Sequence, residues 1–412
     1  MKKICIISIF FLFIFLNACA SKDIYGEDVT SKQQETINKI ELLFNKLDSD
    51  FFSEDDWSFF EKNINKHIER IKECQNIEEI DHLFFVINEE LNRKIIIQSL
   101  FSKIEEYSNG SGTKDDPYII NNAAQLLKLS KDAYCEKTEG IYYMLGENIN
   151  MNGWRWVPIG YNYDGKLFKG NFNGNGYVVS NISFNQINYE GFNDLGLFGY
   201  NKGDIKNVGL VNFNVDIKWN SVIGYNLTVN TGGIAGLNEG VINNCYVIGN
   251  INLEYFGDLG GHKSPNHVNA GGIVGINFAK GIISNCYSDM NINVSYSNEQ
   301  GTVNIGGISL GKGIVSNSLS VCDLRINVDS YVNDYYSEKY EISPEAFNCY
   351  AYDNESREDQ LHCTEEDLNN KDFYYDVLGW NNEVWNCDNI IFQNNIFVDN
   401  HWPTIINDEQ KG

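Results

Sequence analysis

Basic residues are scarce in this chain. Its 412 residues contain 31 Lys and Arg against 56 Asp and Glu, which leaves a formal net charge of −25. Such an acidic surface repels phosphate backbones and anionic lipids, so we expect no nucleic-acid partner. The chain has only five prolines, and no Cys-x-x-Cys pair occurs in it. The missing pair argues against a zinc ribbon or a thioredoxin-type redox site.

The common catalytic signatures are absent as well. The sequence has no His-Glu-x-x-His or His-x-x-Glu-His zinc motif, no Gly-x-Ser-x-Gly elbow and no P-loop. His262 and His267 share one loop, where a solvated loop is favoured over a metal-binding pair. We therefore expect no catalytic residue, no metal and no cofactor.

The N-terminus is typical of an export signal. A short basic start is followed by Ile4–Leu16, an apolar run that is short for a membrane span of about 20 residues. The run ends in Leu16-Asn17-Ala18-Cys19, which resembles a bacterial lipobox, although Asn17 departs from the usual residue type. Cleavage between Ala18 and Cys19 would remove residues 1–18 and leave a lipid on Cys19 as the membrane anchor. An ordinary signal peptide and an uncleaved membrane helix are the alternatives.

A helical domain follows a polar tether of residues 19–30. Within residues 31–107, apolar residues recur at helical steps in three sets, which predicts helices near 32–49, 54–73 and 77–106. Ser53 with Asp56, and Asn76 with Glu79, have the spacing of capping boxes. Three amphipathic helices can bury their apolar stripes in a small bundle. The bundle is either a spacer that lifts the next domain off the membrane or a cap on that domain.

Internal repeats begin beyond residues 108–136, which we interpret as a linker and a helical N-terminal cap. A Gly-x-Ile-x-Asn element recurs, as in Gly240–Asn244 and Gly281–Asn285, and most copies follow a Gly-flanked apolar block such as Gly232–Gly236. Successive copies are 26, 37, 41, 32 and 31 residues apart. The aligned asparagines are Asn181, Asn207, Asn244, Asn285, Asn317 and Asn348.

This pattern predicts a mainly β fold, a right-handed parallel β-helix over residues 137–406 that is preceded by the small α-helical bundle. A unit of this length cannot bury its own apolar face, but stacked copies can. Asn tolerates the positive φ that a turn needs, and stacked Asn amides can hydrogen-bond along the coil. The residue after each Asn should then point inward. The expected inward ladder is Ile182, Val208, Cys245, Cys286, Ser318 and Cys349. The residues two places further on should form another, Phe184, Leu210, Val247, Ser288, Ser320 and Ala351.

The variable spacing predicts long loops that leave the coil at 217–230, 254–269, 294–304 and 327–343. Loops on a rigid scaffold are where binding residues usually lie. The candidate contact residues in these loops are Tyr255, His262, His267, Tyr296, Tyr331, Tyr335 and Tyr336.

The repeats resemble the GLUG-motif repeats of bacterial surface proteins. Gly196-Leu197-Phe198-Gly199 is nearly the naming motif, and Gly-x-Ile-x-Asn-Cys-Tyr is a typical continuation. Leu378-Gly379-Trp380 and Trp402-Pro403 resemble the closing segment of such proteins, which would start near residue 365. The resemblance covers about residues 108–406 and implies the fold more strongly than a function, since the motif occurs in adhesins, in surface lipoproteins and beside protease domains. Cys363 and Cys387, near the closing segment, are the cysteines that we expect to pair.

The sequence favours a surface-displayed, lipid-anchored scaffold that binds an unknown protein or glycan through its inter-rung loops. Ala20 after Cys19 favours the outer membrane or cell surface within the cell envelope. The enzyme alternative is a polysaccharide lyase or glycosidase, which would need carboxylates clustered on one face of the coil. A purely structural envelope lipoprotein is the second alternative.

Overall fold

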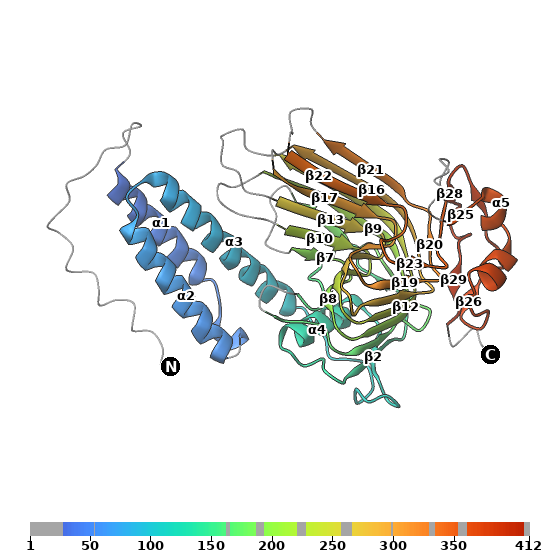
Figure 1. Cartoon of the computed structure of the whole chain (residues 1–412). Helices are drawn as coiled ribbons and strands as arrows, with labels where there is room; N and C mark the ends of the chain where they lie inside the picture. Colours follow the sequence, from blue (N-terminus) through green and yellow to red (C-terminus); the bar gives the residue numbers. More distant parts are fainter. Residues whose placement is uncertain are drawn as a thin grey trace. The chain divides into compact units, whose positions relative to one another are not determined.

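The computed structural model describes residues 28–52, 54–161, 165–186, 193–220, 228–256, 266–297, 300–328, 334–352 and 361–407. The chain divides into two compact units, one up to Ile95 and one from Ile96 onward. Figure 1 shows helices in the first unit and mainly strands in the second. Ala18, Cys19, Ser53, His262 and Tyr331 lie outside the described residues.

The helical unit contains the three expected helices. They are α1 (Val29–Phe44), α2 (Glu54–Glu73) and α3 (Ile77–Phe101), with a 3-10 turn, η1 (Ser49–Phe51), between α1 and α2. Asp28 caps α1 by accepting a hydrogen bond from the Thr30 backbone N–H, and Asn76 accepts one from Glu79 at the start of α3. The apolar stripes meet in one buried cluster that includes Ile37, Ile40, Phe60, Ile64, Ile71, Ile80, Leu83, Ile87 and Leu91.

Short helix α1 ends earlier than its apolar pattern predicts. The expected helix runs to residue 49, but Asn45 ends α1 and the chain turns into η1, which Asp48 caps. The Asp48 side chain accepts from the Asp50 backbone N–H, so a local side-chain bond replaces another helical turn there.

The second unit is a parallel β-solenoid, as the repeats predict. In its described residues the chain passes in turn through three parallel sheets. The largest contains β1 (Tyr118–Ile120), β2 (Tyr142–Leu145), β3 (Ile149–Asn150), β4 (Asn171–Asn173), β5 (Val178–Ser180), β6 (Ser183–Gln186), β9 (Asp204–Asn220), β12 (Val241–Phe256), β15 (Ile282–Ser284), β16 (Tyr287–Ser297), β19 (Ile314–Ser316), β20 (Leu319–Ser320), β21 (Asp323–Val328), β23 (Ala346–Phe347), β24 (Tyr350–Tyr352) and β25 (Leu361–Cys363).

Two smaller parallel sheets complete each turn. One contains β7 (Asp194–Leu195), β10 (Thr228–Gly232), β13 (Asn266–Gly271), β17 (Gln300–Gly306) and β22 (Asp334–Tyr340). The other contains β8 (Phe198–Asn201), β11 (Ala235–Asn238), β14 (Val274–Asn277) and β18 (Ser309–Leu310). Helix α4 (Ala123–Tyr134), between β1 and β2, lies where the sequence predicts a helical lead-in.

The Gly-flanked apolar blocks form the bend between the two smaller sheets. Gly232 ends β10 and Ala235 begins β11. A Cβ atom on Gly232 would lie 2.5 Å from the Ala235 carbonyl oxygen and from the Val274 Cα of the next turn. Backbones of successive turns therefore approach too closely for a side chain, which explains why glycine recurs there.

The six aligned asparagines all have positive φ, between 49° and 62°. Their amides are bonded along the coil in several places: Asn207 donates to Asn173, Asn244 to Asn207, and Asn348 to Asn317, over 2.9–3.1 Å. Asn285 instead donates to Asn243. The run of amides is therefore interrupted rather than continuous.

The alignment of Asn181 and Ile182 with the later copies is wrong. Val178–Ser180 of β5 pairs with residues 209–211, so Asn181 stacks between Asn150 and Asn212 and not on Asn207. Ile182 accepts a hydrogen bond from the Asn214 backbone N–H, beside Phe213. In the preceding turn it is Gly174, and not Ile182, that lies against Val208. A Cβ atom on Gly174 would lie 2.5 Å from the Val208 Cβ and 2.6 Å from the Val208 Cα.

From Val208 onward the inward positions are as expected. Val208 pairs with Cys245, the Cys286 N–H donates to the Ser318 hydroxyl, and all four side chains and that of Cys349 are at most 4% exposed. The parallel ladder Leu210, Val247, Ser288, Ser320 and Ala351 is confirmed by strand register. Phe184, by contrast, pairs with Val215 and not with Leu210.

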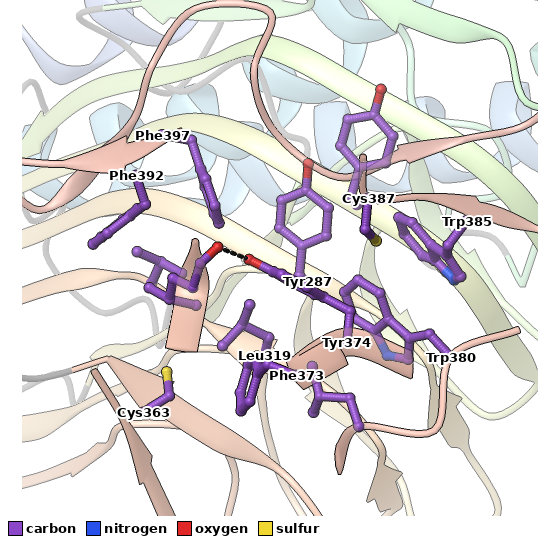
Figure 2. Close-up of a cluster of buried hydrophobic side chains, with 14 of the residues drawn as sticks. Tyr287, Leu319, Cys363, Phe373, Tyr374, Trp380, Trp385, Cys387, Phe392 and Phe397 are labelled. Carbon is purple, nitrogen blue, oxygen red and sulfur yellow. Dashed lines mark hydrogen bonds between the residues drawn. The ribbon is translucent and has the colours of Figure 1, made fainter. Parts of the chain in front are cut away.

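Residues 361–407 close the solenoid through an aromatic cluster (Figure 2). This segment contains α5 (Glu365–Leu368), a π-helical turn η3 (Phe373–Val377), β26 (Trp385–Asn386), β27 (Phe392–Gln393), β28 (Ile396–Phe397) and β29 (Thr404–Ile405). The rings of Trp380 and Trp385 stack on each other with their centroids 4.3 Å apart, and both pack against Tyr287 of the coil. The Tyr287 hydroxyl donates to the Pro403 carbonyl. The segment thus seals apolar surface that an open turn would expose to water.

The expected bond between Cys363 and Cys387 is wrong. Both cysteines are free and buried, and Figure 2 shows them well apart in the aromatic cluster. Burial raises the pKa of each thiol to about 12, so these cysteines act as small apolar residues.

Candidate functional site

The repeats use their extra residues mainly to lengthen strands. β9, β12 and β16 continue past the coil core, and β21 adds a fourth strand beside them. We define the strand extension as residues 214–220, 250–256, 291–297 and 323–328. β17 contacts both β16 and β21, so the sheet of β7, β10, β13, β17 and β22 forms a second layer (Figure 1).

Within the described residues, the stretches expected as long loops at 217–230, 254–269, 294–304 and 327–343 are mostly strand. β9 extends to Asn220 and β10 starts at Thr228. In the three later repeats, the strands likewise extend into the stretches that were expected as loops. The period-two alternation of Asn214-x-Asp216-x-Lys218 and of Asn250-x-Asn252-x-Glu254 was the signal for strands. High Asn and Tyr content was a weaker guide than this alternation.

Tyr255 and Tyr296 are not loop contact residues. They lie on β12 and β16, pair with each other in register, and stack at 5.0 Å with 1% and 2% of their surface exposed. Alternate positions of each strand point inward, odd-numbered on β12 and even-numbered on β16, so an aromatic side chain there fills the core. The tyrosine pair therefore stiffens the strand extension from inside.

The remaining contact candidates within the described residues are also on strands. His267 lies on β13, half-buried, with its Nδ1 2.9 Å from the Thr302 hydroxyl. Tyr335 and Tyr336 lie on β22.

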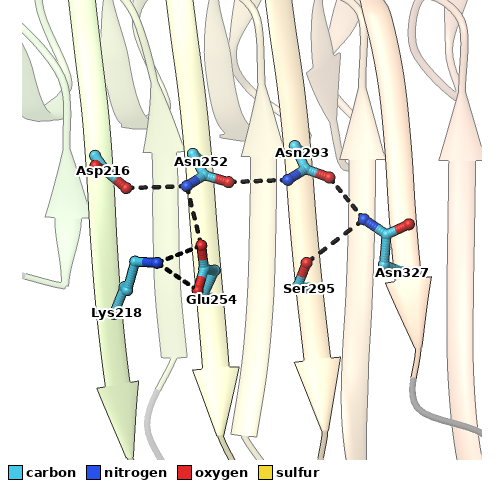
Figure 3. Close-up of polar contacts among 7 residues, drawn as sticks. All are labelled: Asp216, Lys218, Asn252, Glu254, Asn293, Ser295 and Asn327. Carbon is cyan, nitrogen blue, oxygen red and sulfur yellow. Dashed lines mark hydrogen bonds and ion pairs between the residues drawn. The ribbon is translucent and has the colours of Figure 1, made fainter.

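The outward side of the strand extension carries rows of amides and charges, drawn in part in Figure 3. We call this surface the amide face. Its members are Asn214, Asp216, Lys218, Asn250, Asn252, Glu254, Asn291, Asn293, Ser295, Asp323, Arg325 and Asn327. β12 and β16 pair without interruption over residues 246–256 and 287–297, so the rows are straight. This surface was not predicted from the sequence, because the stretches expected as loops include its outer residues Lys218, Glu254, Ser295 and Asn327.

Hydrogen bonds link four strands of the amide face, three through one row and the fourth diagonally from the next row (Figure 3). Asn252 donates to Asp216, Asn293 to Asn252, and Asn327 to Asn293, over 2.8–2.9 Å. Such ladders hold neighbouring amides in one orientation. In the adjacent row, Asn291 donates to Asn250 over 2.9 Å.

The charges of the amide face are nearly balanced. Lys218 bonds both oxygens of Glu254 at 2.7 Å, and Arg325 pairs with Asp323, its Nε lying 3.1 Å from a carboxylate oxygen. Asp216 is the remaining charged residue and accepts the Asn252 amide. Three carboxylates against two bases leave one net negative charge on this face.

Two carboxyl groups elsewhere in the solenoid have raised pKa values. Asp194 ends a ladder in which Asn269 donates to Asn230 and Asn230 to Asp194, and burial raises the pKa of Asp194 to about 6. Asp289 lies beneath the closing segment, where burial raises its pKa to about 7 although the Phe397 backbone N–H bonds to it. Raised carboxyl pKa values also occur at catalytic sites. Here Asp194 is only 4% exposed and bonded to an amide, which is a structural arrangement.

The described residues contain no group of three or more His, Cys, Asp or Glu side chains that could hold a metal ion. No helix in the described part of the chain is long and apolar enough to cross a membrane.

Comparison with known proteins identifies the repeat. Residues 266–293 match the family described as the GLUG motif, and they span β13, β14, β15 and the first half of β16, which is one passage through all three sheets. The chain is a GLUG-motif β-solenoid protein.

Two relatives match part of this GLUG β-solenoid in sequence. A protein of Evansella cellulosilytica named "Putative Gly-rich membrane protein" is 29% identical over 149 residues, 34% of this chain and 15% of that protein. "Halomucin" of Haloquadratum walsbyi is 31% identical over 150 residues, 34% of this chain and 2% of that protein. The GLUG β-solenoid thus matches only a small part of either relative.

Among solved structures, a "putative immunoglobulin A1 protease" from Bacteroides ovatus matches the GLUG β-solenoid with a TM-score of 0.40. The identity is 21%, and the match covers 73% of this chain and 95% of that one.

Proposed function

We propose that this GLUG β-solenoid is a non-catalytic binding protein of the cell envelope, anchored by a lipid on Cys19 and binding its ligand through the strand extension. The observation that carries the proposal is the use of the extra repeat residues. Residues 214–220, 250–256, 291–297 and 323–328 lengthen the strands of the largest sheet, and their outward side chains build an ordered polar surface. A chain that served only to stack turns would gain nothing from that surface.

The envelope location rests on two supports. One relative carries the name of a membrane protein, and Leu16–Cys19 resembles a lipobox. A Cys19→Ala variant of the full chain should lose metabolic labelling with palmitate and leave the membrane fraction. Unchanged labelling would contradict the lipid anchor, and a labelled protein in the soluble fraction would contradict the envelope location.

Binding is tested by displaying the full chain on cells and measuring their retention on immobilised matrix proteins and glycans. Retention should exceed that of cells without the protein and should fall when soluble protein competes. The matched control is a displayed chain with Asn152→Ala and Asn382→Ala, two exposed residues outside the strand extension, and its retention should equal that of the wild-type protein. Equal retention of cells with and without the protein on every surface would contradict a binding function.

The enzyme alternative predicts a different measurement. A lyase or glycosidase would release soluble oligosaccharides from polysaccharide incubated with the purified protein. On the amide face, Glu254 is neutralised by Lys218 and Asp323 by Arg325, which does not favour the paired acid and base that hydrolysis uses. Product release by the wild-type protein would overturn the non-catalytic proposal.

A further inference from the structure

The strand extension presents hydrogen-bonding groups at regular intervals, and their charge balance suggests what they bind. We propose that the amide face binds an uncharged, hydroxyl-rich linear polysaccharide that lies across β9, β12, β16 and β21. This inference rests on the proposed binding function and names the chemical class of its ligand. Charge, unused hydrogen-bonding capacity, spacing and rigidity each support it.

The charge distribution of the amide face favours an uncharged partner over an ionic one. The chain as a whole carries a formal charge of −25, so an anionic polymer is repelled at long range. A cationic partner would be drawn to acidic surface, but on this face the carboxylates of Glu254 and Asp323 are already paired with Lys218 and Arg325. A neutral polymer is not repelled by the acidic chain, and it does not need a free carboxylate to bind.

The amides retain capacity for a ligand. An Asn side chain offers two N–H donors and two acceptor lone pairs. Asn250 is exposed and uses one acceptor position, for Asn291, and Asn291 is exposed and uses one donor. Asn293 donates once and accepts once. Each of these residues can therefore both donate to and accept from a sugar hydroxyl, which itself does both.

The spacing of the amides suits a polymer. Equivalent residues on neighbouring strands repeat at about 4.8 Å. Asn214, Asn250 and Asn291 are in register on three successive strands, and Asp216, Asn252 and Asn293 form the next row. In the first row, a ligand with one repeating unit per strand meets the same amide donor and acceptor on β9, β12 and β16.

The amide face is also held rigid before binding. Ladder bonds fix the amides of Asn252 and Asn293 from outside, while Ile251, Leu253, Ile292 and Val294, all at most 1% exposed, fix the backbone from inside. A preorganised surface loses little conformational entropy on binding, so weak single hydrogen bonds can add up.

The test uses full-length protein in affinity electrophoresis through gels that contain a polysaccharide. Neutral probes are hydroxyethyl cellulose and galactomannan, and the anionic probe is polygalacturonate. The wild-type protein should be retarded by at least one neutral probe and not by polygalacturonate. Asn250→Ala with Asn291→Ala should weaken retardation about 30-fold, the equivalent of about 2 kcal/mol for the loss of one hydrogen bond from each residue.

The matched control is Asn152→Ala with Asn382→Ala. Both are exposed asparagines of the solenoid unit outside the amide face, and their side chains make no hydrogen bond within the described residues. This control should migrate as wild type, and circular dichroism should show both double variants equally folded.

Three results would overturn the inference. If polygalacturonate or an immobilised protein binds the wild type while both neutral probes do not, the ligand class is wrong and the binding function stands. If the neutral probes bind equally to wild type and to the Asn250/Asn291 variant, the site is wrong. If no probe and no matrix surface retains the wild type, the binding function itself fails.

Discussion

Replacement of Asp289 by Asn should stabilise the solenoid, and only above acidic pH. Burial beneath the closing segment raises the Asp289 pKa from its ordinary 3.8 to about 7, whereas the Phe397 N–H bond acts in the opposite direction. Below pH 4 the carboxyl is protonated in both the folded and the unfolded chain, so it does not lower the free energy of unfolding. Between about pH 4 and 7 the unfolded chain releases the proton and the folded chain keeps it, so stability falls as pH rises. Above pH 7 the loss is complete.

The size of this loss follows from the pKa values. Each pKa unit corresponds to about 1.4 kcal/mol, so the two values give a cost of up to about 4 kcal/mol above pH 7. Asn keeps the acceptor oxygen for the Phe397 N–H and has nearly the same volume, but it carries no charge. The free energy of unfolding of Asp289→Asn should therefore exceed that of wild type by a few kcal/mol at pH 8 and match it at pH 4.

The assay is urea unfolding of the full chain, followed by tryptophan fluorescence of the closing segment at several pH values. Asp194→Asn is an informative comparison, because the Asp194 pKa is raised only to about 6. The gain in free energy of unfolding from Asp194→Asn should reach its maximum at a pH about one unit lower than the gain from Asp289→Asn. That maximum should be about 3 kcal/mol. A pH-independent difference between Asp289→Asn and wild type, or a loss of stability at pH 8, would refute this reasoning.

Three further predictions concern packing and hydrogen bonding, each measured as the free energy of unfolding in urea. Asn238→Ala should cost about 3 kcal/mol, because it removes four buried hydrogen bonds and leaves the Gly240 N–H and the Asn277 Oδ1 without these partners; a cost below that of Asn293→Ala, on the exposed ladder, would contradict this. Tyr255→Ala should cost about 3–5 kcal/mol through the cavity left beside Tyr296, and a neutral result would show that the strand extension is not packed. Cys286→Ser should cost less than about 2 kcal/mol, because Ser318 already occupies the same inward ladder, while Cys286→Leu should cost more through overpacking; the reverse order would contradict the ladder.

The coil could be predicted from the sequence because its turns impose strict local requirements. A positive φ at Asn207, Asn244, Asn285, Asn317 and Asn348 recurs with the motif, and period counting from each Asn gives the inward residues. The count failed at Asn181, where the Gly of the motif lies one place further from the Asn. That offset was a sign that β5 pairs five residues further along β9, next to Asn212.

The buried amide ladder Asn201, Asn238 and Asn277 was missed for a different reason. These residues precede the Gly of each repeat by two to four positions and are 0% exposed. Nothing in local sequence distinguishes an Asn that turns the chain from one that bonds inside it, since both follow an apolar strand and precede a Gly. The partners that make burial of an amide tolerable lie on neighbouring turns, about 37–39 residues away in sequence.

Comparison of the two kinds of ladder explains why binding is assigned to the strand extension and not to the coil. Asn238 uses all of its capacity within the protein: its Nδ2 donates to Gly240 and Asn277, and its Oδ1 accepts from Asn201 and Gly240. Asn250 carries the same functional group but uses one acceptor position. An amide that is saturated and buried can only stabilise, whereas one that is exposed and largely unsatisfied exchanges water for ligand at little cost. The same residue type therefore has a structural role at the bends of the coil and a recognition role on the amide face, and the difference follows from the number of partners around each side chain.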